Sequence, residues 1–271
     1  MKKFFRVLLI LALAVTCSLS LFACGDGDGE VGVKGIKCKK IDGVYTIYDY
    51  VEQDGVTELN IGECVEEGVT DIRIKKGAFS GNSTLVKIIV SNKVTEIDKG
   101  AFEGMNSLET LEVPFIGRTA NSDAYYKESK TSVDKSVDSA RTIAHFFGDS
   151  EYGLACSVKI SYNDTSSVTC YMPLTFKEVI VNATEDYSIP MYAFNGAVNL
   201  TSVKLVGKID AIGEYAFAGC KEIKAIELPK TVKNVYKGAF KDCVKLAELT
   251  NGADTIFGED ALEGTKVTLA D

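Results

Sequence analysis

Residues 216–229 read Ala-Phe-Ala-Gly-Cys-Lys-Glu-Ile-Lys-Ala-Ile-Glu-Leu-Pro, and they decide the fold because the pattern recurs along the chain. The Ala-Phe pair at 216–217 returns 23 residues later at 239–240 and stands 23 residues earlier at 193–194. Closer to the N-terminus the pair occurs at 78–79 and at 101–102, again 23 residues apart. A fixed period of this length, carried by apolar positions, predicts a solenoid in which each repeat forms one coil.

The apolar positions within one repeat predict its local structure. In Leu85-x-x-Ile88-x-Val90 the last two apolar residues alternate, which favours a short strand with one face turned inward. One coil buries too little apolar surface to be stable alone, so we expect the coils to stack. Stacking predicts an internal ladder of phenylalanines, with Phe79 beside Phe102, and Phe194 beside Phe217 and Phe240.

The repeat resembles the BspA-like leucine-rich repeats of bacterial surface proteins, whose consensus is close to Ala-Phe-x-Gly-Cys-x-x-Leu-x-x-Ile-x-Leu-Pro-x-x-Val-x-x-Ile. The match is closest at 216–239 and extends over 78–114 and 193–260. Many other leucine-rich repeats have Asn after the strand, where this chain has Lys93, Lys208 and Thr231. The resemblance implies a mainly β solenoid with short helices, a cell-surface location and adhesion to host or microbial proteins. It does not identify a ligand.

Residues 1–23 have the features of a lipoprotein signal peptide. Lys2, Lys3 and Arg6 precede an apolar run over 7–15 that is too short to span a membrane comfortably. The segment ends in Leu21-Phe22-Ala23-Cys24, which resembles a bacterial lipobox and implies cleavage before Cys24 and a lipid on its sulfur. The alternative is an ordinary secretory signal in which Cys24 has no special role. Residues 24–35, rich in Gly and acidic residues, are expected to form a flexible acidic tether.

The charge of the chain excludes one class of partner. Its formal net charge is −8, and removing residues 1–23 takes away three positive charges and no acidic residue, which leaves −11. An acidic protein does not follow a phosphate backbone, so we expect no nucleic-acid binding.

The remaining cysteines favour packing over metal binding. Cys220 and Cys243 occupy the Cys position of the repeat and are expected to be buried free thiols. The chain has no Cys-x-x-Cys pair, which argues against a structural zinc site. Export permits disulfides, and Cys38 with Cys64 is one candidate pair.

The repeats divide the rest of the chain into regions. Residues 36–67 are expected to form an N-terminal cap with strand character, since the first coil lacks a neighbour on one side. Leucine-rich repeats follow over 68–114 and again over 175–271, where the last residues form a C-terminal cap that includes a possible strand at Val267 and Leu269. Between them, 115–174 departs from the period and forms an island. We predict an amphipathic helix over 129–147, followed by a β-hairpin with arms at 156–162 and 167–172.

Candidate catalytic groups are few. His145 is the only histidine, and it could pair with Cys156 or Cys170 as a Cys–His enzyme. It stands beside Phe146 and Phe147, where a lone histidine is more often packed than catalytic. We therefore predict no enzyme, no catalytic residues, no cofactor and no metal site.

These observations favour a non-catalytic surface lipoprotein that binds other proteins. The alternative is a structural or assembly component of the cell envelope. Single charges dominate the exposed positions of the repeats, and such charges bind weakly. The island carries aromatic residues that the repeat does not require, and tyrosine is enriched where proteins meet partners. The candidate partner-binding residues are Tyr125, Tyr126 and Tyr152, with the alternative that these side chains cover the seam between island and solenoid.

Overall fold

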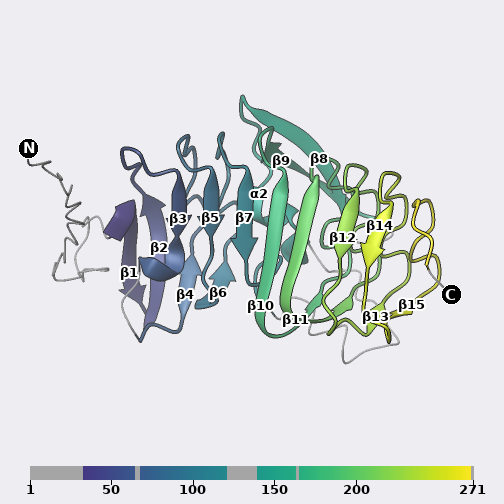
Figure 1. Ribbon diagram of the computed structural model, residues 1–271. Coiled ribbons are helices and arrows are strands. Elements are labelled where there is room, and N and C mark those ends of the chain that lie inside the picture. The colour runs from purple at the N-terminus through teal and green to yellow at the C-terminus, as the bar shows by residue number, and fades with distance from the viewer. Residues whose placement is uncertain (1–32, 65–67, 121–138, 163–164, 270–271) are drawn as a thin grey trace, which may run out of the picture.

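The computed structural model describes residues 33–64, 68–120, 139–162 and 165–269, and these form a solenoid of stacked coils. Strands of successive coils lie side by side along one axis, with β1 at one end of the molecule and β15 at the other (Figure 1). The coils stack through two ladders of mostly parallel strands. The long strands β10 (Glu178–Ile189) and β11 (Ser202–Ile212) take part in both ladders.

The first ladder follows the Leu-x-x-Ile positions of the repeat. It contains β3 (Glu58–Asn60), β5 (Lys87–Ile89), β7 (Thr110–Val113) and the first halves of β10 and β11. Beside β11 it continues with β12 (Ala225–Glu227) and β14 (Glu248–Thr250). Side chains alternate inward and outward along each strand, as the pattern predicts.

The second ladder precedes the Ala-Phe pair of each repeat. It contains β2 (Val44–Tyr50), β4 (Ile72–Ile74) and β6 (Val94–Ile97) in one half of the solenoid. In the other half it contains the ends of β10 and β11, then β13 (Asn234–Val235) and β15 (Ile256–Phe257). Apart from β2, each of these strands ends four residues before the alanine of the Ala-Phe pair or, for β15, before Ala261 of Ala261-Leu262, so the ladder leads directly into the turn.

The Ala-Phe turn contributes the predicted phenylalanine ladder. The ring centroids of Phe79 and Phe102 are 5.5 Å apart, and the rings are stacked. Phe217 stacks on Phe194 at 4.9 Å and on Phe240 at 5.1 Å, with the planes within 9° of parallel in both pairs. All five rings are fully buried, which confirms that the repeated phenylalanines form the core.

Hydrogen bonds between turns set the spacing of the coils. The backbone N–H of Phe194 donates to the carbonyl of Ala216 at 2.7 Å, and Phe217 donates in the same way to Ala239. The thiols of Cys220 and Cys243 donate to the carbonyls of the phenylalanines one coil earlier, at 3.1 and 3.0 Å. Both thiols are buried and free, as predicted.

The N-terminal end is covered by an antiparallel strand. A short 3₁₀ turn, η1 (Val33–Gly35), leads into β1 (Ile36–Ile41), which pairs with β2. A second 3₁₀ turn, η2 (Ile61–Glu63), follows β3. The predicted Cys38–Cys64 bridge is wrong, because Cys38 is disulfide-bonded whereas Cys64 is a free, buried thiol. The Cys64 Sγ instead donates to the carbonyl of Asn60 at 3.2 Å.

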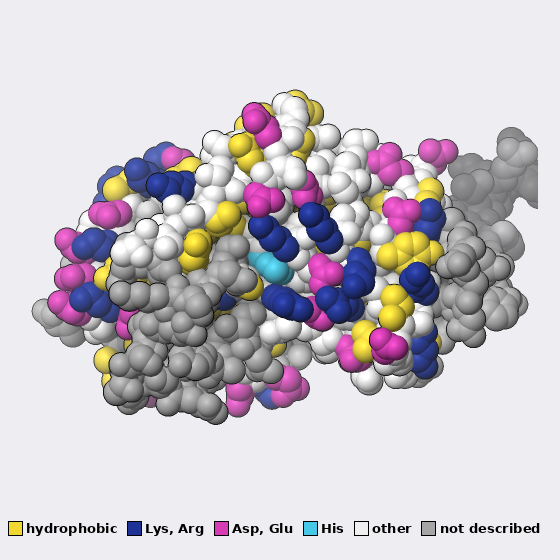
Figure 2. Space-filling model, turned by 180° about the vertical axis from the view of Figure 1, so that it is seen from behind, with side chains coloured by type: hydrophobic (Ala, Val, Ile, Leu, Met, Phe, Trp, Pro, Cys, Tyr) yellow, Lys and Arg dark blue, Asp and Glu magenta, His cyan; other side chains and the backbone are white. Residues whose placement is uncertain are grey.

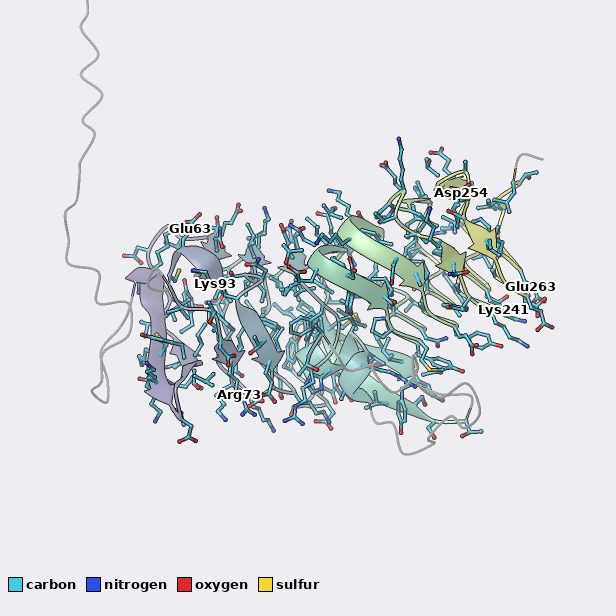
Figure 3. All side chains as sticks on the ribbon, turned by 90° about the horizontal axis from the view of Figure 1, so that it is seen from below. Glu63, Arg73, Lys93, Lys241, Asp254 and Glu263 are labelled. Atoms are coloured by element: carbon cyan, nitrogen blue, oxygen red, sulfur yellow. The ribbon has the colours of Figure 1, made fainter. Side chains whose placement is uncertain are left out.

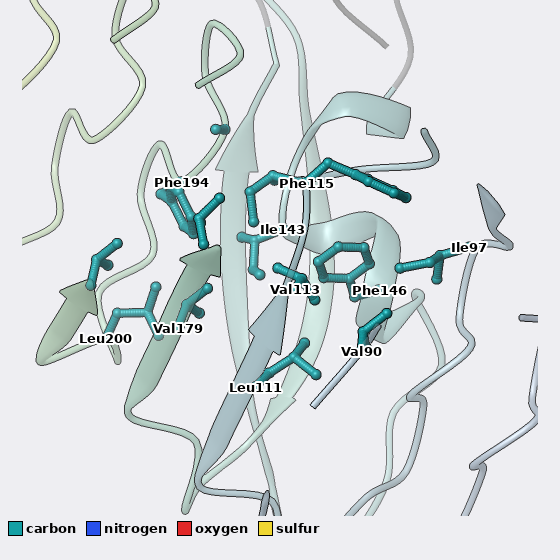
Figure 4. Packing of buried hydrophobic residues seen from close by; sticks show 14 of the residues in the cluster. Val90, Ile97, Leu111, Val113, Phe115, Ile143, Phe146, Val179, Phe194 and Leu200 are labelled. Atoms are coloured by element: carbon teal, nitrogen blue, oxygen red, sulfur yellow. The ribbon is translucent and has the colours of Figure 1, made fainter. Parts of the chain in front are cut away.

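The island contains one complete coil of the solenoid. Strand β7 pairs directly with β10, although the aligned residues Leu111 and Val179 are 68 residues apart instead of the usual 23. The backbone N–H of Phe102 donates to the carbonyl of Phe146 at 3.0 Å, so Phe146 takes the alanine position and Phe147 follows it in the phenylalanine position. Toward the next coil the frame is irregular, because the N–H that donates to the carbonyl of Ala193, at 2.8 Å, is that of Ile143. Figure 4 shows Phe146 and Ile143 packed among the side chains of the neighbouring coils.

Two insertions explain why the period is hidden in this coil. Phe147 follows Phe102 by 45 residues, which is 22 more than one repeat. The other 23 extra residues lie between Phe147 and Phe176, which occupies the leucine position before β10. The second insertion contains the predicted hairpin, with arms β8 (Ala155–Ser161) and β9 (Ser167–Pro173).

The described part of the predicted helix is not continuous. Residues 129–138 lie outside the described ranges, and 139–147 form a 3₁₀ turn, η3 (Ser139–Arg141), and one short helix, α2 (Ala144–Phe147). A long helix through 147 is therefore wrong, because Phe146 and Phe147 have to enter the turn of a coil. The possible terminal strand is also wrong, since the structure has no strand over 266–269.

The phenylalanine ladder predicts a large difference between two neighbouring substitutions. Phe217→Ala should lower the free energy of unfolding by about 3–5 kcal/mol, the usual cost of truncating a buried Phe. Lys221→Ala, at an exposed position four residues away, should change it by less than about 0.5 kcal/mol. Urea unfolding of the two variants measures both values, and equal effects would contradict the assigned frame.

Candidate interaction surface

The outer face of the first ladder is polar, and its charged groups are largely paired. Burial acts to raise the pKa of Glu178, but hydrogen bonds from Lys204 and Ser202 outweigh it and hold the pKa below its ordinary value. Lys204 Nζ lies 2.8 Å from the Glu178 carboxylate, and the Asn182 amide donates to Glu112 at 2.9 Å. These contacts join adjacent coils. Many charged and polar side chains of this face are therefore bound to other side chains of the solenoid.

A charged network crosses the second ladder in the N-terminal half. Arg73 contacts Asp98 at 2.7 Å and Glu96 at 3.3 Å. Glu96 in turn contacts Arg118 at 2.6 Å, which links the network to the coil that contains the insertions. In the C-terminal half, Lys241 and Glu263 of adjacent coils form an ion pair (Figure 3). In the view from behind, acidic and basic side chains are interspersed on the surface, and small groups of hydrophobic side chains lie among them (Figure 2).

The β8–β9 hairpin is fixed on the flank of the solenoid. Its inner face is buried and contains Val158, Ile160, Cys170 and Met172. The carbonyl of Lys159 approaches Gly196 so closely that a Cβ there would lie 2.4 Å from the oxygen. Only glycine fits at this position of the turn, and its φ of 79° lies in the region that glycine adopts without strain. The hairpin is therefore a rigid support for whatever it presents to solvent.

Two exposed leucines lie next to each other where the hairpin begins and ends. Leu154 is 55% exposed and Leu174 is 52% exposed, and the Leu174 N–H donates to the Leu154 carbonyl at 3.0 Å. Tyr152 lies two residues before Leu154 in the sequence, and its hydroxyl donates to the carbonyl of Tyr171 at 3.1 Å. We call Tyr152, Leu154, Tyr171 and Leu174 the hairpin base. Burial raises the pKa of Tyr152, in keeping with a side chain that packs on the hairpin.

The structure describes one of the four residues singled out from the sequence. Cys24, Tyr125 and Tyr126 lie outside the described ranges. Tyr152 is half-buried, and its hydroxyl donates to the carbonyl of Tyr171, which also belongs to the island. Partner binding by the Tyr152 ring remains a prediction. Leu154 and Leu174 were missed because single exposed leucines carry no periodic signal. The sequence held one indication of their exposure, which is that both leucines lie just outside the two predicted arms of the hairpin.

The environment of His145 and the nearby cysteines gives no support for a Cys–His enzyme. His145 is buried, its Nε2 lies 2.9 Å from the carbonyl of Ile97, and its own carbonyl accepts from Gly100 at 2.8 Å. Burial raises the pKa of the Cys170 thiol to about 12 and also raises the pKa of Cys156, which disfavours the nucleophilic thiolate at neutral pH. Within the described ranges no group of His, Cys, Asp and Glu is arranged to hold a metal ion. None of the helices described there is long and apolar enough to cross a membrane.

Solved structures of bacterial leucine-rich repeat proteins are similar to this chain at low identity. One from Bacteroides ovatus is 19% identical over 89% of this chain, with a TM-score of 0.39, and one from Eubacterium ventriosum is 19% identical over 88%, with a TM-score of 0.48. This chain spans 58% and 52% of the lengths of those two proteins. A leucine-rich cell surface protein from Faecalibacterium prausnitzii is 14% identical over 80% of this chain and 90% of its own, with a TM-score of 0.23. No curated protein matches the sequence.

The family is shown by the sequence pattern itself. The family model for the BspA type leucine-rich repeat region matches six copies over residues 58–147 and 170–268, which is 189 of 271 residues. The match includes Phe146 and Phe147, in agreement with their place in the coil. The chain belongs to the BspA-type leucine-rich repeat family.

Proposed function

We propose that this chain is a lipoprotein anchored through Cys24 at the bacterial cell surface, and that its solenoid binds other proteins without catalysing a reaction. The observation that carries the proposal is the hairpin base, where two exposed leucines stand on a rigidly supported hairpin. Exposed apolar side chains that adjoin each other on a fixed backbone are a common feature of partner sites. The family supports a role in protein interaction, and the name of one similar structure supports a surface location.

The repeats support this role by holding the hairpin rather than by contacting the partner. Their apolar residues are buried against adjacent coils, and many of their exposed charges pair with charges one coil away. Exposed ion pairs contribute little free energy and are screened by salt. The hairpin base offers apolar area together with the half-buried rings of Tyr152 and Tyr171, so it is the better candidate for specific binding.

A matched pair of double variants tests the hairpin base. Leu154→Ser with Leu174→Ser should weaken capture of a protein ligand from a mucus or serum extract by roughly tenfold or more, the loss expected on removing an interface hot spot. The control is Val198→Ser with Val244→Ser, which removes two exposed apolar side chains from the turns of other coils. Each of these valines is 44% exposed. Both variants should keep the wild-type melting temperature. Equal capture by the two variants would place the site elsewhere.

Tyr125→Ser with Tyr126→Ser, measured in the same assay, tests the tyrosines outside the described ranges. Loss of capture at an unchanged melting temperature is expected if these two residues also contact the partner. Retained capture with a lowered melting temperature would show that they belong to the core.

Lipid attachment predicts a change in fractionation. Cys24→Ser should move the protein from the membrane fraction to the soluble fraction or leave it with an uncleaved signal peptide, because no acylated cysteine remains to hold it. Mass spectrometry of the wild-type N-terminus should show a lipid on Cys24. A wild-type protein found wholly in the soluble fraction would contradict the anchor.

The absence of catalysis predicts unreactive thiols in the native protein. Burial raises the pKa of Cys64 to about 11 and of Cys243 to about 12, and it also raises the pKa of Cys220. At pH 8, iodoacetamide should therefore label these three and Cys170 more than roughly tenfold more slowly in the native protein than in urea. Rapid native labelling of Cys156 or Cys170 would supply a nucleophile and contradict the proposal.

A further inference from the structure

The second ladder is interrupted in the middle of the solenoid. Strands β2, β4 and β6 belong to one sheet with β1, whereas the ends of β10 and β11 belong to another sheet with β13 and β15. Between them lies the coil that begins at Leu108 and ends at Phe147, which we call the central coil. In this coil Ser139–Arg141, just before the turn, form the 3₁₀ turn η3 instead of a strand. The sheet that joins the central coil to the next coil is therefore the first ladder, through β7 and β10.

The stack of phenylalanine rings is interrupted at the same place. Phe102 meets Phe146 edge to face, with ring centroids 6.0 Å apart and planes at 83°. Phe147 contacts Phe176 at 4.8 Å, with planes at 59°. Nearly parallel stacking resumes at Phe194, as described above. We call the coils before the central coil the N-terminal stack and the coils from Phe176 onward the C-terminal stack.

Hydrogen bonds between turns show where the interruption is greatest. Three backbone N–H groups of the first turn in the C-terminal stack donate to the next turn: those of Tyr192, Phe194 and Gly196. Between the described backbone groups of the central turn and that first turn there is one such bond, from Ile143 to the carbonyl of Ala193 (Figure 4). Its donor lies four residues before Phe147, so the two turns are out of register. The stability of a solenoid includes a term for each contact between neighbouring coils, and this boundary has fewer of the repeated contacts than the others.

The β8–β9 hairpin contacts the coils on both sides of this boundary. On the side of the central coil, Arg141 Nη2 donates to the carbonyl of Tyr162, just after the end of β8, at 2.8 Å. On the side of the C-terminal stack, the carbonyl of Lys159 lies against Gly196. These two contacts are three residues apart in the hairpin. The buried inner face of the hairpin adds apolar contact to them, so the hairpin supplies attachment where the second ladder and the rings do not.

We propose that the two stacks separate locally at this boundary, and that the hairpin is a clasp that holds them together. The pairing of β7 with β10 acts as the hinge, and the boundary opens on the side of the second ladder and the turns. Each stack keeps its own rings and hydrogen bonds when the hairpin leaves Gly196. The hairpin holds the stacks whether or not a ligand binds at the hairpin base, so the failure of one proposal leaves the other standing.

Two glycines at equivalent positions test the clasp. Gly196 and Gly219 have φ of 79° and 72°, so alanine imposes a similar backbone strain at either position. A Cβ at position 196 would lie 2.4 Å from the carbonyl oxygen of Lys159, whereas at position 219 the nearest atoms are 3.7 Å away. Gly196→Ala therefore displaces the hairpin, and Gly219→Ala is the matched control that leaves it in place.

Native-state hydrogen exchange of the full chain, followed by mass spectrometry of peptides, measures the opening. Gly196→Ala should speed exchange in peptides that contain Ile143 by roughly tenfold or more, because local opening breaks the bond to Ala193. Peptides that contain Phe79 or Phe240, inside the two stacks, should change by less than about twofold. Gly219→Ala should leave exchange at Ile143 unchanged.

Three outcomes would overturn the proposal. The first is equal acceleration at Ile143 in the two variants, and the second is acceleration in Gly196→Ala that is uniform along the chain. The third is acceleration confined to the hairpin, which would show that the boundary stays closed without it. If Gly196→Ala does not fold, Ile160→Val, which shortens a buried side chain of the hairpin, replaces it, with Ile226→Val of β12 as its control. The same pattern is then expected with a smaller factor, and the same three outcomes contradict it.

Discussion

The hydrogen bond from the phenylalanine N–H of one coil to the alanine carbonyl of the next is the constraint on which the rest of the structure depends. It occurs from Phe79 to Ala101, from Phe194 to Ala216 and from Phe217 to Ala239, at 2.7 to 3.0 Å. A fixed distance between turns requires a fixed distance between rings, so the phenylalanines stack and the strands on either side pair in register. A residue that disturbed one turn would have to be accommodated by the coils on both sides of it, since each coil contacts only its neighbours.

The repeats could be predicted from sequence because each position makes the same contact in every coil. The coil within the island could not, because its two insertions separate Phe102, Phe147 and Phe176 by distances that match no period. The pattern over 133–147 favoured a helix, but the frame of the neighbouring coils determines the backbone at Phe146 and Phe147. The strands of the hairpin were predicted within one residue, since their alternation is local. Cys64 was a candidate partner for Cys38 because spacing alone does not show where a side chain is buried.

Surface features were less accessible to sequence reasoning than the core. The tyrosines of the island were chosen because the repeat does not require them, yet the hydroxyl of Tyr152 is bound to Tyr171 and its ring is half-buried. The exposure of Leu154 and Leu174 depends on how the hairpin lies against Gly196, which no local pattern encodes.

The first insertion has a consequence for how this chain can change. The backbone N–H of Arg118 donates to the carbonyl of Ala140 at 2.6 Å, so the chain leaves the coil and returns to it at neighbouring points. The free-energy cost of closing a flexible loop between fixed ends rises slowly, by about 0.6 kcal/mol for each doubling of its length. A replacement of different length or composition between these two residues would therefore alter neither the spacing of the coils nor the stacking of the rings. Mutation can supply a new surface there while the stability of the solenoid stays almost the same.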